Sequence, residues 1–153
     1  MLKISKAASL ALHVMVYLYK NRDGLITNKE ISTIFGASED HIAKVLQRLS
    51  KHGLVESIRG PKGGFSIGMN PDSITMIDVY ESIEGPLITH DCLLPQKRCL
   101  NDECVLMNGI CKEVNKLFKE YMTRTHLSEL KEFHFPENIS IKGADKYAKG
   151  NSV

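Results

Sequence analysis

Long hydrophobic runs are missing from this sequence of 153 residues. No stretch approaches the ~18 consecutive apolar residues that a membrane-spanning helix needs, so a membrane span is excluded. The N-terminal segment is apolar at first, but His13, Tyr17 and Lys20 interrupt it and no signal-peptide cleavage site follows. We therefore expect a cytoplasmic protein.

A strong net charge is also missing, because the formal charge at pH 7 is only +2. The distribution of charge is more informative. Residues 1–69 carry ten Lys/Arg and five Asp/Glu, whereas residues 70–153 carry ten Lys/Arg and thirteen Asp/Glu. A basic first half and a mildly acidic second half fit a DNA-binding portion joined to a segment of another kind.

Cysteine is scarce, and its few positions are crowded together. The chain has four cysteines, Cys92, Cys99, Cys104 and Cys111, separated by six, four and six residues. A secreted disulfide domain usually spreads its cysteines across the fold, so this crowding favours metal binding or redox chemistry. The spacing lacks the repeated close pairs of a structural zinc site and favours an iron–sulfur cluster over zinc.

Periodicity and turn residues predict a mainly α fold with one small β-hairpin. We expect helices at residues 6–19, 28–35, 39–51, 76–84 and 104–122, and a short helical piece at 127–133. Thr27 and Glu30 have the spacing of a capping box, and Ser38 and Thr75 are predicted N-caps. Residues 54–59 and 65–67 are predicted strands, joined by the Gly-rich turn 60–64.

The predicted helix at residues 39–51 has two distinct faces. Its apolar residues follow helical spacing and should face the core: Ile42, Val45, Leu46 and Leu49. The opposite face carries hydrogen-bonding and cationic side chains: Asp40, His41, Lys44, Gln47, Arg48 and Lys51. A helix in the major groove needs such side chains, although an ordinary solvated face carries them as well.

The predicted hairpin favours the DNA interpretation. Arg59, Gly60 and Lys62 place two cations on a tip that glycine keeps narrow enough to approach phosphates or enter a minor groove. A nucleotide-binding loop is not indicated, because no helix follows the Gly-Gly pair and the Gly-Lys-Ser/Thr ending is absent. The order of helices and hairpin predicts a winged helix-turn-helix.

The segment Leu-Val-Glu-Ser-Ile-Arg-Gly-Pro-Lys-Gly-Gly-Phe at residues 54–65 resembles the wing of the Rrf2-type regulators, which include iron–sulfur and nitric-oxide sensors and a cysteine-metabolism regulator. The resemblance runs from the first helix to residues 126–130. It implies a homodimer in which the long helix, with Ile110, Val114, Leu117 and Tyr121 on one face, crosses its partner. It also implies that Arg59 enters the minor groove and that Ser38, His41 and Lys44 lie near phosphates or bases.

The same resemblance implies that Cys92, Cys99 and Cys104 ligate an iron–sulfur cluster between the wing and the long helix. The fourth ligand departs from the family pattern. One branch of the family uses a histidine where this chain has Met107, and another uses an N-terminal acidic residue, but no acidic residue precedes Asp23 here. Cys111 is the candidate for the fourth ligand. The equal alternative is that Cys111 is a buried core cysteine beside the apolar stripe.

These observations divide the chain into four predicted parts. They are a DNA-binding domain at residues 1–85, a cysteine-bearing loop at 86–103, a dimerisation helix with a short helical piece at 104–135, and a tail at 136–153 that we expect to be disordered. No nucleophile–base pair or cofactor loop indicates an enzyme. The alternatives to a cluster-sensing regulator are a regulator with zinc or a thiol–disulfide switch, and a winged-helix module that binds another protein.

Overall fold

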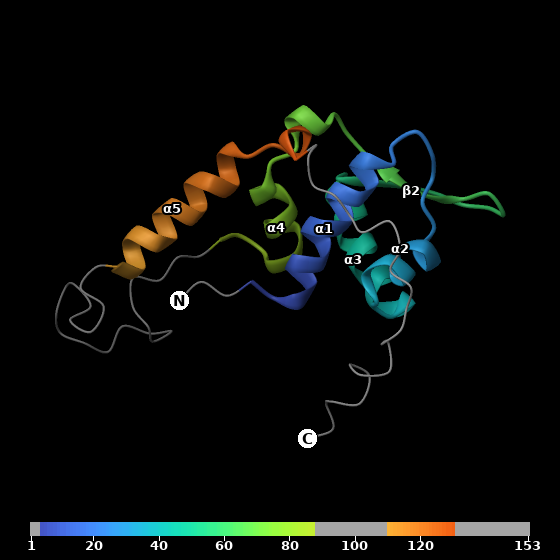
Figure 1. Cartoon of the computed structure of the whole chain (residues 1–153), viewed down its shortest axis with the longest axis horizontal. Helices are drawn as coiled ribbons and strands as arrows, with labels where there is room; N and C mark the ends of the chain where they lie inside the picture. The colour runs from blue at the N-terminus through green and yellow to red at the C-terminus, as the bar shows by residue number, and fades with distance from the viewer. Residues whose placement is uncertain (1–3, 88–109, 131–153) are drawn as a thin grey trace, which may run out of the picture.

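The computed structural model describes residues 4–87 and 110–130, and it confirms a mainly helical fold with one two-stranded hairpin (Figure 1). The elements run in the following order: α1 (Lys6–Lys20), α2 (Asn28–Phe35), α3 (Glu39–Lys51), β1 (Val55–Ile58), β2 (Gly64–Ile67), the 3-10 turn η1 (Pro71–Ser73), α4 (Met76–Glu84), α5 (Ile110–Arg124) and the 3-10 turn η2 (Leu127–Glu129).

Side-chain caps start the helices where the sequence placed them. Ser38 Oγ accepts from the backbone N–H of His41, and Thr75 with Asp78 forms a complete capping box at the start of α4. At α2, Thr27 Oγ1 accepts from the Glu30 N–H as predicted. The Glu30 carboxylate, however, accepts from the Tyr17 hydroxyl of α1 at 2.9 Å. Only the Thr27 half of the predicted capping box therefore forms. The Glu30 carboxylate accepts from the Tyr17 hydroxyl of α1 in place of the Thr27 backbone N–H.

The core is built around α1, which α3 and α4 both contact. Met15 and Leu18 of α1 are fully or almost fully buried, as are Leu46 of α3 and Val79 of α4. Because α3 buries one apolar face in this core, its opposite face is directed outward.

The hairpin is extended by a third stretch of backbone that the sequence analysis did not predict. β1 pairs antiparallel with β2, and Ile26 pairs with Phe65 on the other side of β2 through two backbone hydrogen bonds of 2.9 and 3.0 Å. This second pairing holds β2, close to the wing turn, against the segment between α1 and α2.

The end of α5 returns to the start of α4. The Met76 N–H donates to the Thr125 carbonyl at 3.0 Å, and the Leu127 N–H donates to the Ile74 carbonyl at 2.8 Å. Within the described residues, the helical piece expected at 127–133 is a single 3-10 turn, Leu127–Glu129, because the chain here pairs with another segment. The expected helix start at 104 lies outside the described residues.

In residues 4–87 and 110–130, none of the helices has both the length and the apolar character required to cross a membrane.

Candidate nucleic-acid interface

The turn between α2 and α3 sets the direction of α3. Gly36 ends α2 with a left-handed φ of 59°, a conformation that glycine adopts readily. Asn28 Nδ2 donates to the Glu39 carbonyl at 3.1 Å and so ties the start of α2 to the first turn of α3. Sequence reasoning did not identify Asn28, because its partner is eleven residues away.

α3 presents the predicted polar face at the surface. Lys44, Gln47 and Lys51 are exposed, whereas Ile42 and Leu49 on the opposite side are fully buried. Ser38 is exposed at the N-cap, and His41 in the first turn is half-buried. The surface face thus combines amide, hydroxyl and cationic groups along the helix, which is the chemistry that base edges and phosphates require.

The wing tip places two cations at the surface on a tight turn. Arg59, Gly60 and Lys62 are all exposed. The Gly63 N–H donates to the Gly60 carbonyl at 2.9 Å, and Gly60 has a φ of 123° that other residues rarely adopt. A Cβ at Gly63 would lie 2.2 Å from the Ile58 carbonyl oxygen. Glycine is therefore required at position 63 because the backbone of the turn approaches it closely. The sequence had indicated only that glycine keeps the tip narrow.

Arg48 differs from its neighbours on α3. Its Nη1 donates to the backbone carbonyl of Ile83 near the end of α4, at 3.1 Å. The structure thus gives this predicted DNA-contacting residue a partner inside the protein.

Three of the predicted metal ligands, Cys92, Cys99 and Cys104, lie outside the described residues. Cys111 lies in the first turn of α5, but the structure describes only its backbone and not its side chain. Among the residues that are described, no group of three or more His, Cys, Asp or Glu side chains could hold a metal ion. The cysteine segment therefore stays a prediction.

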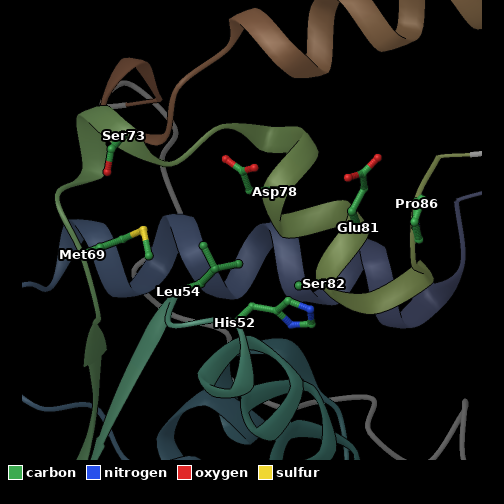
Figure 2. Close-up of a pocket in the computed structure, with 8 residues that line it drawn as sticks. All are labelled: His52, Leu54, Met69, Ser73, Asp78, Glu81, Ser82 and Pro86. Carbon is green, nitrogen blue, oxygen red and sulfur yellow. The ribbon is translucent and has the colours of Figure 1, made fainter.

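A hollow of 460 Å³ lies between the end of α3, the base of the wing and α4 (Figure 2). Asp78, Glu81 and Ser82 line it from α4, and His52 and Leu54 line it from the segment after α3. Its polar side chains already have partners within the protein. Asp78 bonds Thr75, Glu81 Oε1 accepts from the Leu87 N–H, and Ser82 donates to a carbonyl of its own helix. Nothing in this hollow indicates a ligand.

An exposed polar helix after a tight turn, followed by a cationic hairpin, defines the chain as a winged helix-turn-helix DNA-binding protein. The chain belongs to the Rrf2 family: a family model described as "Iron-dependent Transcriptional regulator" matches residues 4–132. Transcription regulators of this family bind DNA.

Relatives and solved structures agree with this assignment. The regulator NsrR of Bacillus subtilis is 33% identical over 92 residues, which cover 60% of this chain and 63% of that protein. The structure of CymR, the global cysteine regulator of B. subtilis, is 31% identical with a TM-score of 0.72, and the match covers 88% of this chain and 99% of that one. The structure of T. potens IscR is 24% identical with a TM-score of 0.65, covers 84% of this chain and 85% of that one, and supports the fold.

Proposed function

We propose that this protein is a homodimeric transcription regulator that binds specific double-stranded DNA and senses redox, iron–sulfur or nitric-oxide status through a cysteine-ligated iron–sulfur cluster. The observation that supports DNA binding is that two elements, α3 and the wing, both expose cationic side chains. α3 presents Lys44, Gln47 and Lys51, and the wing presents Arg59 and Lys62. Cations supply non-specific affinity for phosphates, and hydrogen-bonding side chains on a groove helix supply sequence discrimination.

The dimer part of the proposal is supported by an apolar stripe on α5. The exposed large hydrophobic residues of this helix are Ile110, Val114, Leu117 and Tyr121, and Leu117 is 65% exposed. Their spacing places them on one side of the helix. The wing projects at the end of the molecule away from α5 (Figure 1). A second copy paired along α5 would bury the stripe and leave both wings free for DNA.

The cluster part rests on the chemistry of the donor set and on the description of the family as iron-dependent. Cys92, Cys99 and Cys104, with Cys111 as the candidate fourth ligand, would hold the cluster through soft thiolate sulfurs. When bound, a cluster supplies a centre that reacts with oxidants or nitric oxide. The chain's own contribution is the position of these ligands, which precede α5 in the sequence or lie in its first turn, so that ligation would link the segment between α4 and α5 to this helix.

DNA binding is tested with duplexes enriched from a random pool. We expect a dimer in sedimentation and affinity that falls steeply with salt, because bound lysines and arginines displace counterions. Half-sites should lie ~34 Å apart along the DNA, one helical turn. A monomer, or equal affinity for every duplex, contradicts the proposal and favours the alternative of a module that binds another protein.

The wing offers a sharper comparison. Arg59→Ala should weaken specific binding by roughly 1–3 kcal/mol, because an arginine in the minor groove contacts base edges as well as phosphates. Lys62→Ala should weaken specific and random DNA alike, since a lysine at the tip contacts phosphate only. The two variants are compared by fluorescence anisotropy on both duplexes, and equal effects of the two would argue against a minor-groove role for Arg59.

A further inference from the structure

Arg48 lies on the recognition helix but bonds to the end of another helix. Its guanidinium Nη1 is 3.1 Å from the Ile83 carbonyl oxygen, and Ile83 belongs to the last turn of α4, Met76–Glu84. The last carbonyls of a helix lack partners within the helix and carry the negative end of its dipole, so a cation is stabilised there. An arginine at this position is therefore explained by its bond to the end of α4, with no contact to nucleic acid required.

The rotation of α3 separates Arg48 from Lys44 and Gln47, two of the residues that are predicted to contact DNA; His41, two turns earlier, lies on the same side of the helix as Arg48. At about 100° per residue, Asp40, Lys44, Gln47 and Lys51 surround the centre of the exposed face. Arg48 lies roughly 70° from that centre, toward one edge of the helix. Its side chain therefore leaves α3 toward α4, which packs against α3.

α4 is connected at both ends to the rest of the protein. At its start, the Met76 N–H bonds Thr125 at the end of α5. At its end, the Ile83 carbonyl accepts from Arg48, and Glu81 Oε1 accepts at 2.9 Å from the N–H of Leu87, the second residue of the predicted cysteine-bearing loop. A shift of α4 would thus move α3 through Arg48.

We infer that Arg48 is a positioning residue for DNA recognition: it fixes the orientation of α3 against α4 and does not contact DNA. The inference rests on the proposed DNA-binding function. It revises the sequence-based assignment of Arg48 and keeps the other predicted contacts of α3.

The test compares Arg48→Met with Lys44→Met. Both substitutions remove one charge and all hydrogen-bond donors from an exposed residue of α3 while keeping an unbranched side chain. Affinity for an enriched duplex and for a random duplex is measured over a range of salt concentrations at a temperature where both variants are folded by circular dichroism. For Arg48→Met we expect specific affinity to fall roughly 2- to 30-fold, with random-DNA affinity and its salt dependence unchanged. For Lys44→Met we expect the salt slope to fall by about 0.9 on both duplexes, the value of one lost phosphate contact.

Two results would overturn the inference. A salt slope for Arg48→Met that falls as for Lys44→Met would show that Arg48 contacts phosphate. Unchanged specific affinity with a lowered melting temperature would show that Arg48 only stabilises the fold. A wild-type chain that binds no duplex would refute the proposed function, and this inference with it.

A measurement on the wild-type chain covers the case in which Arg48→Met does not fold. With ¹⁵N-labelled arginine, the guanidinium signal of Arg48 should be protected from exchange before DNA is added and should stay in place afterwards, whereas the Arg59 signal should shift. A shift of the Arg48 signal as large as that of Arg59 would overturn the inference.

Discussion

The Tyr17 hydroxyl joins the first two helices by donating to Glu30 Oε1 at 2.9 Å. Burial, together with this hydrogen bond and the charge of Glu30, raises the pKa of Tyr17 to about 12 from its usual 10. The unfolded chain loses the phenolic proton near pH 10, whereas the folded chain keeps it until about pH 12. The folded state binds more protons in this window, so its stability must fall as the pH rises from about 10 to 12.

Tyr17→Phe is therefore expected to have two effects. It should lower the free energy of unfolding by about 1 kcal/mol at neutral pH, because one hydrogen bond is lost. It should also make the loss of stability between about pH 10 and 12 shallower than in the wild type. Urea unfolding across this range measures both effects. An alkaline slope equal to that of the wild type would contradict the assignment.

Gly63 is the wing residue at which a side chain has least room. In Gly63→Ala the new Cβ would lie 2.2 Å from the Ile58 carbonyl oxygen, so the turn between β1 and β2 must rearrange. We expect a loss of stability of about 1–3 kcal/mol and weaker specific DNA binding, since Arg59 and Lys62 sit on this turn. Gly24→Ala is the matched control, because its Cβ would meet no atom within 4 Å. Denaturant unfolding and DNA titration measure the stability and the specific DNA affinity of both variants. Equal losses in the two variants would refute the steric argument.

At the scale of elements, α5 connects to the rest of the described structure mainly through one side. Met122 is buried, and Phe118 lies edge-on to Tyr80 of α4 with ring centroids 5.9 Å apart. Ile110, Val114, Leu117 and Tyr121 stay exposed. The helix thus has one face that packs within the chain and a separate apolar stripe that the proposed dimer would bury.

Leu117→Glu is expected to dissociate the dimer, because it places a charge in the centre of the stripe. The variant should sediment as a folded monomer and lose most of its affinity for a two-half-site duplex, while its helix content stays the same. Thr123→Glu adds the same charge on the exposed opposite side of α5 and should remain dimeric. Dimeric Leu117→Glu with unchanged DNA affinity would show that the dimer forms elsewhere.

At the scale of the whole molecule, α4 follows the predicted DNA-reading helix in the sequence and precedes the predicted sensing segment. Its start bonds the end of α5, and its last turn receives Arg48 of α3. The sensing that we propose for the cysteines and the DNA reading that we propose for α3 would therefore be coupled through one helix. This coupling needs a shift of α4 that both the cysteine segment and α3 follow.

The cysteine proposal predicts that protein purified without oxygen contains iron and acid-labile sulfide. Cys92→Ala, Cys99→Ala and Cys104→Ala should each abolish or severely reduce both, because each removes a thiolate ligand. Iron and sulfide analysis with a visible spectrum makes the measurement. One tightly bound zinc per chain and no iron would instead support the zinc alternative.

Cys111→Ala separates the two interpretations of the fourth cysteine. If Cys111 is a ligand, its loss should match the other three in iron content and spectrum. If it is a core cysteine beside the apolar stripe, the cluster should persist and the free energy of unfolding should fall by about 1 kcal/mol, the cost of a small cavity.

Local signals in the sequence determined the helices and their starts. Apolar residues at helical spacing place α3 at Glu39–Lys51, and Ser38 and Thr75 cap the helices that follow them. The hairpin follows from its Gly-rich turn, and its strands differ from the prediction by one residue at each end of β1 and at the start of β2. These features depend on residues within a few positions of one another, so the sequence alone carries them.

Only the tertiary structure decided which predicted residues have partners far along the chain. Arg48 lies 35 residues from Ile83, and Tyr17 lies 13 residues from Glu30. The pairing of Thr75 with His126, which ends α5 against α4, also joins segments that are distant in sequence. A pattern along the chain shows that Arg48 is polar and off the buried face, but the packing of α4 against α3 determines which acceptor it reaches. The sequence therefore determined the surface that is predicted to meet DNA, and the fold decided which of its cations is held within the protein.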